Sequence, residues 1–231
     1  MHQLRELRRP PFCRFRLGFV TRLMKDEAFL AAQRAGIYAP HVAPINRLVD
    51  SLVEDEWPKG RGWLPHVAPL HGGVNARVLS ILRDPGAKTL LDGGSGMLCV
   101  ENDDATAAKQ CELFGDAGIA VSDVTPWNAY PWYINKPPSG PQVTEGLVPL
   151  RHVIALMESN LQVVLLQGGH ARSLWRKLMR LDKGFVGLPG VTVVETFHPG
   201  NQALQTNDPD ERRRRVDRRI QAMAEVAAVL S

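Results

Sequence analysis

Three polar side chains, Asp84, Asn128 and His198, each follow an apolar, β-branched run that is typical of a strand. Each lies in a short turn-forming segment, and these segments are Arg83–Gly86, Trp127–Pro131 and Phe197–Gly200. In an open parallel sheet, ligands bind in the crevice beyond the carboxyl ends of the strands. We therefore expect the three side chains to converge on one pocket, as an acid or base, an amide reader and an imidazole. That combination suits hydrolysis of an N-glycosidic bond with recognition of a base edge.

Each of these residues has a structural interpretation beside the chemical one. Asp84 could position water or stabilise an oxocarbenium-like transition state, but Asp-Pro-Gly is also a common turn signal. Asn128 offers a donor and an acceptor that match the N3–H and O4 of a uracil-like edge, or it could be a core asparagine bonded to backbone. His198 could donate to the O2 of a departing base and stabilise its negative charge, although a lone histidine before proline is commonly structural.

The composition is that of a protein with one well-packed α/β domain and an N-terminal extension. The 231 residues are 44% hydrophobic and 23% charged, with a net charge of +4, which permits a polyanionic partner without establishing one. The three cysteines, Cys13, Cys99 and Cys111, have no CxxC spacing, so we expect no disulfide framework, zinc site or iron–sulfur cluster. The sequence has no apolar run of about 18 residues and no secretory signal pattern, which favours a reducing cytoplasm.

Basic residues gather at both ends of the sequence. The N-terminal group is Arg5, Arg8, Arg9, Arg14 and Arg16, and the C-terminal group is Arg212, Arg213, Arg214, Arg215, Arg218 and Arg219. Either group could face nucleic acid, and either could equally be a solvated helix face or a flexible arm.

Strand and helix patterns alternate after residue 74. Strands are expected at 76–82, 119–127, 162–167 and 191–197, and helices at 103–117, 143–159, 171–181 and 209–230. This alternation predicts a three-layer α/β/α fold with a central four-stranded parallel sheet. Two helices, at 18–35 and 44–56, and a Pro- and Gly-rich connection at 58–73 precede it. We thus expect residues 1–73 to be a helical extension packed on the core formed by residues 74–231. Gly93–Gly96 lacks the rest of a P-loop and is interpreted as a loop beside the pocket.

In their order, these segments resemble the motifs of the uracil-DNA glycosylase superfamily over residues 74–230. Asp84-Pro85-Gly86 resembles the motif that presents the water-activating residue, and Trp127-Asn128-Ala129 resembles the strand end whose Asn reads uracil. His198-Pro199-Gly200 resembles the last motif, His-Pro-Ser, with Gly in place of Ser. Cys99 stands where the family has a Phe that stacks on uracil, so Trp127 or another ring would have to substitute.

The resemblance implies a uracil-DNA glycosylase-like fold and a DNA repair enzyme that flips its target base. Asp84 and His198 would be catalytic, while Asn128, Gly86, Cys99 and Trp127 would contact the base. Gly86 stands where the most uracil-restricted branch has a Tyr that blocks the thymine methyl, so other damaged pyrimidines would be admitted. The residues expected to contact DNA are Pro199, Gly200, Asn201 and Leu204, the last as a wedge into the helix.

The resemblance also implies a monomer that acts without metal or other cofactor on DNA containing a damaged or deaminated base, in the bacterial cytoplasm with the nucleoid. No Lys nucleophile occurs in the three segments, so the chain is not expected to cleave the DNA strand. Two alternatives stay open. The chain could bind damaged DNA with little or no cleavage, or it could hydrolyse free nucleosides or nucleotides in the same crevice.

Overall fold

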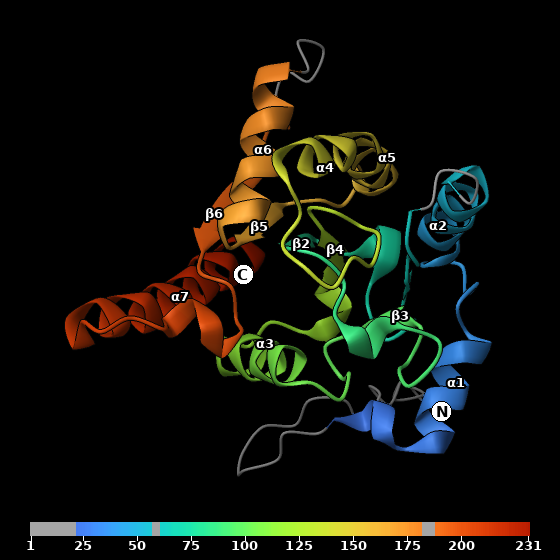
Figure 1. The fold of residues 1–231 in the computed structure, drawn as a ribbon, viewed down its shortest axis with the longest axis horizontal. Coiled ribbons are helices and arrows are strands. Elements are labelled where there is room, and N and C mark those ends of the chain that lie inside the picture. The colour runs from blue at the N-terminus through green and yellow to red at the C-terminus, as the bar shows by residue number, and fades with distance from the viewer. Residues whose placement is uncertain (1–21, 57–60, 182–187) are drawn as a thin grey trace, which may run out of the picture.

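The centre of the molecule is a four-stranded parallel sheet, as predicted. A computed structural model describes residues 22–56, 61–181 and 188–231. The strands are β2 (Val78–Leu82), β4 (Val124–Asn128), β5 (Val163–Gln167) and β6 (Thr192–Thr196), and they lie in the order β4-β2-β5-β6. Helices cover both faces of the sheet (Figure 1). The predicted α/β class with a parallel sheet is therefore confirmed.

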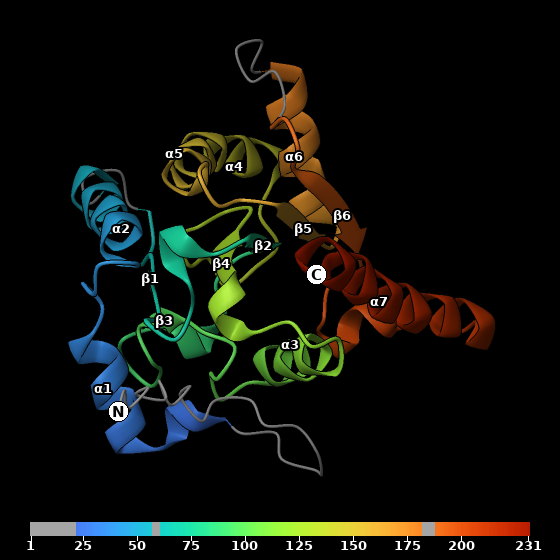
Figure 2. The same ribbon diagram turned by 180° about the vertical axis from the view of Figure 1, so that it is seen from behind.

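The two faces of the sheet bury different helices because side chains alternate along each strand. Leu79, Ile81 and Leu166 face one core cluster, formed with α2 (Ala43–Glu56), α5 (Leu147–Met157) and α6 (Gly169–Leu181). Val78 and Leu165 face the other cluster, formed with α3 (Ala105–Asp116) and α7 (Pro209–Leu230). Figures 1 and 2 show α3 and α7 together on one side and α5 and α6 on the other.

The N-terminal part is less regular than the sequence pattern predicts. The helix expected at 18–35 is a 3-10 turn at Leu23–Lys25 followed by α1 (Glu27–Ala35), and residues 18–21 lie outside the described residues. Asp26 caps α1 by accepting a hydrogen bond from the Phe29 N–H, which fixes where the helix begins. The N-terminal arginines and Cys13 all lie outside the described residues.

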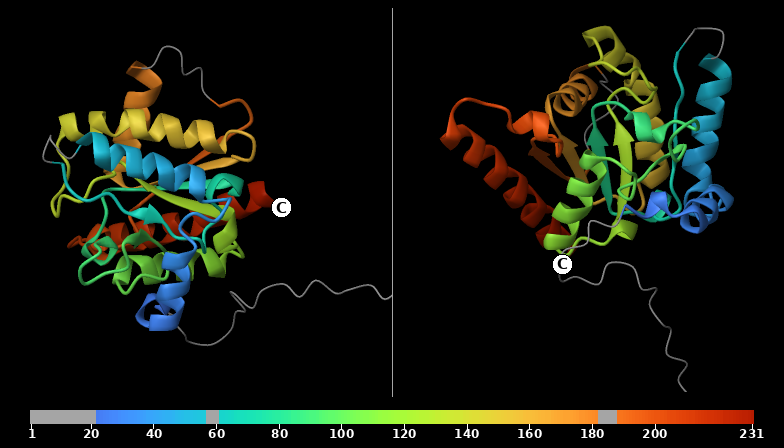
Figure 3. Two further views of the ribbon diagram at one scale, coloured as in Figure 1. Left: turned by 90° about the vertical axis from the view of Figure 1, so that its right-hand side faces the viewer. Right: turned by 60° about the horizontal axis from the view of Figure 1, so that its bottom comes forward.

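A small second sheet occupies a region that the sequence analysis treated as loops. β1 (His66–Val67) pairs in parallel with β3 (Met97–Leu98). The buried side chain of Asn46 joins α2 to this sheet. Its Nδ2 donates to the Val67 carbonyl and its Oδ1 accepts from the Val67 N–H. The left view of Figure 3 shows α2 lying beside α5 on the same side of the molecule.

The helix expected at 143–159 is two helices, α4 (Gly140–Glu145) and α5. They meet at Gly146, where a Cβ would lie 2.0 Å from the Ala129 carbonyl oxygen. Only glycine allows that close approach, and the chain changes direction there. Of the helices predicted after residue 74, α7 has the predicted bounds, set by Asp208 as N-cap and Pro209 at the first helical position. In the described part of the chain, no helix is both long and apolar enough to cross a membrane.

A buried neutral histidine links β4 to the segment that follows β3. His71 Nδ1 donates to the Val124 carbonyl at 3.1 Å, and its Nε2 accepts from the Val100 N–H at 3.3 Å. Burial lowers the pKa of His71 from 6.5 to about 4. The unfolded chain therefore binds this proton at a higher pH than the folded chain does, and acidification between these values favours unfolding.

We predict that the free energy of unfolding falls as the pH is lowered from about 6.5 to about 4, with a His71 share of about 3 kcal/mol. Urea unfolding followed over this pH range measures the fall. His71→Gln should flatten part of the slope, whereas the same change at the exposed His152 should leave it unchanged. An equal slope in His71→Gln and wild type would contradict the prediction.

Candidate functional site

A cavity of about 220 Å³ opens at the carboxyl ends of β2 and β4, and Asp84, Asn128 and His198 all line it. The chain leaves β2 toward α3 on one face and leaves β5 toward α6 on the other, although β2 and β5 are neighbours. The cavity lies next to this reversal, on the β2–β4 side, and open α/β sheets bind ligands beyond the carboxyl ends of their strands. The structure thus brings together the three side chains that the sequence singled out.

Backbone hydrogen bonds beyond the strand ends set Asp84 beside Asn128. The β2–β4 register pairs Leu82 with Asn128. The Ala129 N–H then donates to the Leu82 carbonyl at 2.9 Å, and the Tyr130 N–H donates to the Arg83 carbonyl at 3.0 Å. The two chain segments therefore stay paired as they enter the cavity wall.

Strand alternation decides which side chain of β4 faces the cavity. Pro126 and Asn128 line it, whereas Trp127 points to the opposite face and is fully buried in the core. Asn128 is itself only 2% exposed, and its Nδ2 has no hydrogen-bond partner among the described residues. A buried amide donor without a partner is costly and rare, so Asn128 offers an unused donor beside the cavity.

His198 presents a neutral imidazole with its proton on Nε2. The Gly200 N–H donates to His198 Nδ1 at 3.0 Å, so Nδ1 is an acceptor and the neutral ring carries its hydrogen on Nε2. Burial, together with the positive charges of Arg83 and Arg219 and the neighbouring His170, lowers the pKa of His198 to about 4. At neutral pH the ring is therefore an uncharged Nε2–H donor.

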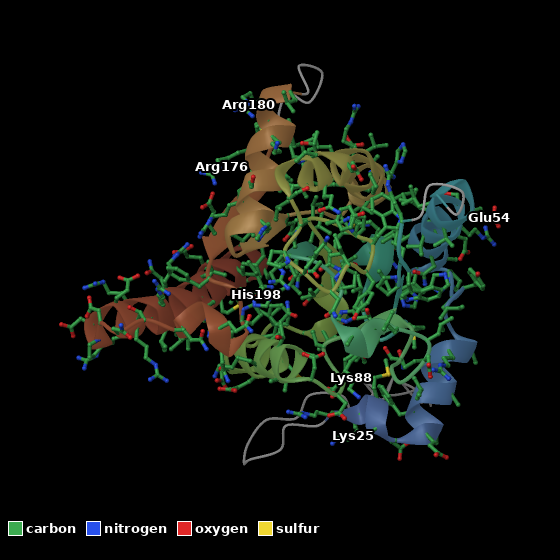
Figure 4. All side chains as sticks on the ribbon, in the orientation of Figure 1. Lys25, Glu54, Lys88, Arg176, Arg180 and His198 are labelled. Carbon is green, nitrogen blue, oxygen red and sulfur yellow. The ribbon has the colours of Figure 1, made fainter. Side chains whose placement is uncertain are left out.

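Two glycines allow the loop that carries His198 to pack closely. A Cβ on Gly200 would lie 3.0 Å from His198 Nδ1 and 3.2 Å from Thr106 Oγ1. Gly168, after β5, has a φ of +102°, and a Cβ there would lie 3.3 Å from the His198 Cβ. His198 thus lies between the turn after β5, the start of α3 and α7, as Figure 4 shows.

Asp84 is a buried carboxyl in contact with a cation. Its side chain is 4% exposed and forms an ion pair with the neighbouring Arg83. Burial raises the pKa of Asp84, and the charge of Arg83 and the nearby His170 oppose part of that rise. The carboxyl is consequently held in one place at the cavity wall.

The aromatic ring that lines the cavity belongs to Tyr133, which the sequence analysis did not select. Cys99 lines the cavity at the position expected for it, and burial strongly raises the pKa of its thiol, so it is not a thiolate nucleophile. Gly86 also lines the cavity, and a Cβ there would contact nothing within 4 Å. The wall is therefore open on that side.

Asn102, Thr106 and Gln110 are further lining residues that the sequence analysis missed. They recur at intervals of four, which places them on one face of α3 and the turn before it. Asn102 Nδ2 donates to the Met97 carbonyl, which leaves its buried Oδ1 without a partner in the described residues. Gln110 Nε2 donates to Ser80 Oγ at 3.0 Å.

The segment after His198 does not line the cavity. Pro199 is buried, Gly200 and Leu204 are partly buried, and Asn201 is exposed. Residues Asn201–Leu204 form a 3-10 turn, and Asn201 borders a shallow basic depression with Arg22, Lys25 and Lys109. A DNA-contacting role for these residues stays a prediction.

Neither a metal centre nor a relative identifies this site. Within residues 22–56, 61–181 and 188–231, no three His, Cys, Asp or Glu side chains are grouped so that they could hold a metal ion. No protein-family model matches the chain, and no curated protein matches its sequence.

We predict that Asn128→Leu increases the free energy of unfolding by about 1–2 kcal/mol, because it removes a buried donor that has no partner. Thermal or urea unfolding measures the change. Asn102→Leu is the matched control, because it also removes the hydrogen bond to Met97 and should destabilise the protein. A large loss of stability in Asn128→Leu would show that Asn128 is structural.

Proposed function

We propose that this protein is a monofunctional DNA glycosylase that hydrolyses the N-glycosidic bond of uracil, or of a related damaged base, after flipping it from the helix. The single observation that carries the proposal is the convergence of Asp84, Asn128 and His198 on one cavity at the carboxyl edge of the sheet. The motif resemblance to uracil-DNA glycosylases, over residues 74–230, supports the same reaction.

Asn128 would read the edge of the flipped base. Its amide can accept from N3–H and donate to O4 of a uracil-like ring, and its Nδ2 has no other partner in the described part of the chain. Tyr133 supplies an aromatic ring in the same cavity, which suits stacking on a base. Gly86 leaves room beside the base for a substituent.

His198 would stabilise the departing base. As the bond between the sugar C1′ and the base nitrogen breaks, the electron pair leaves with the base, and negative charge develops on its carbonyl oxygens. His198 can donate a hydrogen bond from its Nε2–H to that oxygen while the ring stays neutral. Preorganised donors of this kind contribute strongly to catalysis.

Asp84 would act on the sugar side. Its carboxylate can stabilise the cationic sugar and orient the water whose oxygen bonds to C1′. The water's proton passes to Asp84 or to solvent, and the departed base takes up a proton. The products are the free base and an abasic site in an otherwise intact strand.

The DNA backbone would lie across the surface around the cavity. Arg83 lines the cavity, and Arg22, Lys25 and Lys109 border the shallow depression next to Asn201. Lysine and arginine contacts to phosphates give affinity without sequence preference. The loop from Pro199 to Leu204 would approach the gap that the flipped base leaves.

We predict that His198→Ala and Asn128→Ala each lower the rate of uracil excision by on the order of several hundredfold. The assay uses labelled DNA with one uracil, single-stranded or opposite guanine or adenine, and alkali then cleaves abasic sites. His152→Ala, at an exposed position, is the control and should keep the wild-type rate. Near-normal rates in folded His198→Ala protein would rule out this assignment of the site.

A second candidate is a protein that binds damaged DNA without efficient cleavage. Cys99 favours it, because this thiol lines the cavity where the resemblance places the ring that stacks on uracil. In the same assay this candidate predicts that DNA is retained on the protein and recovered uncut. Turnover of free nucleosides would instead indicate a nucleoside hydrolase.

A further inference from the structure

Arg219 is a buried cation on a helix whose other arginines lie at the surface. Arg219 is only 2% exposed, whereas Arg212, Arg213 and Arg214 of the same helix are exposed. No carboxylate forms an ion pair with it within the described residues. A buried charge without a counter-ion lowers stability, so a stability role alone does not explain why arginine occupies this position.

The contacts of Arg219 are with the loop that carries His198. Its Nη2 donates to the His198 carbonyl and, at 2.9 Å, to the Gly200 carbonyl. Its Nε and Nη1 have no partner among the described residues. One nitrogen thus joins the carbonyls of the two residues on either side of Pro199.

Gly200 is held from both sides as a result. Its carbonyl accepts from Arg219, while its N–H donates to His198 Nδ1. That N–H is the contact that leaves the imidazole proton on Nε2. A shift of the Gly200 peptide would release Nδ1 and allow the other tautomer.

We propose that Arg219 is a positioning residue that clamps the His198 and Gly200 carbonyls and so holds the His198 imidazole as a neutral Nε2–H donor. The clamp itself is independent of the reaction. Its consequence for catalysis rests on the function proposed above.

The charge of Arg219 acts in the same direction as the clamp. The groups that face His198 are Arg83 and Asp84 after β2, His170 at the start of α6, and Arg219 on α7, with Asp104 also at the cavity. The positive charges of Arg83 and Arg219 oppose protonation of the ring, as does His170. Removing Arg219 therefore raises the pKa of His198.

Nuclear magnetic resonance of the free protein, labelled with ¹⁵N in the histidine rings, tests the clamp without any substrate. Wild-type His198 should titrate near pH 4 and show the Nε2–H tautomer. Arg219→Met should raise its pKa by about half a unit, because one of the positive charges near the ring is lost, and should mix the tautomers. Arg219→Lys keeps the charge and should retain the low pKa, while Arg219→Gln keeps an amide donor and should retain the tautomer better than Met does.

Arg213→Met, at an exposed position on the same helix, is the matched control and should change neither the titration nor the tautomer. His198→Gln assigns the resonance. An unchanged pKa and tautomer in folded Arg219→Met would overturn the proposal. If Arg219→Met does not fold, Arg219→Gln decides, because it removes the charge, and an unchanged pKa of His198 in that variant would overturn the proposal equally.

Excision kinetics provide a separate readout. Arg219→Met should lower kcat by on the order of tenfold at pH 7 with an unchanged KM for DNA, because the ring is no longer held in the donating orientation. Arg213→Met should leave both constants unchanged. Absence of excision by the wild type would count against the proposed function alone, because the resonance experiment still tests the clamp.

Discussion

The parallel pairing of β2 with both β4 and β5 is the constraint on which the site depends. It places the carboxyl ends of three neighbouring strands at one edge, and the β2–β4 register sets Leu82 opposite Asn128. Because the pairing continues to Tyr130, Asp84 cannot move away from Asn128 without breaking backbone hydrogen bonds. Two of the three polar groups are thereby positioned by the sheet itself.

His198 reaches the cavity from β6, a strand that does not touch β2 or β4. Sheet pairing therefore cannot fix it, and local contacts do so instead. Gly168 admits the close packing of the neighbouring turn, Gly200 donates to Nδ1, and Arg219 holds the loop carbonyls. The orientation of this ring therefore depends on glycine and arginine at these positions.

The sequence predicted the strands and their convergence because buried parallel strands are apolar runs that end in turn residues. It did not reveal which aromatic residue lines the cavity. Trp127 is adjacent to Asn128, and period-two alternation sends it to the core, while Tyr133 reaches the cavity from a loop. The break at Gly146 depends on the distant Ala129 carbonyl, and the β1–β3 pair joins segments about thirty residues apart. No local pattern encodes such contacts.

Two buried polar atoms without partners, Asn128 Nδ2 and Asn102 Oδ1, belong to residues that line the cavity. In the described part of the chain the others are Gln167 Oε1 at the end of β5, two nitrogens of Arg219, and the indole nitrogens of Trp127 and Trp132 in the core. Each lowers stability, since apolar groups of the same shape would avoid the desolvation penalty. Most of the core obeys the opposite rule, with apolar contacts on both faces of the sheet. Polar atoms that lower stability and line a cavity are expected at binding sites, and Asn128 and Asn102 meet that description, whereas the indole nitrogens within the core do not.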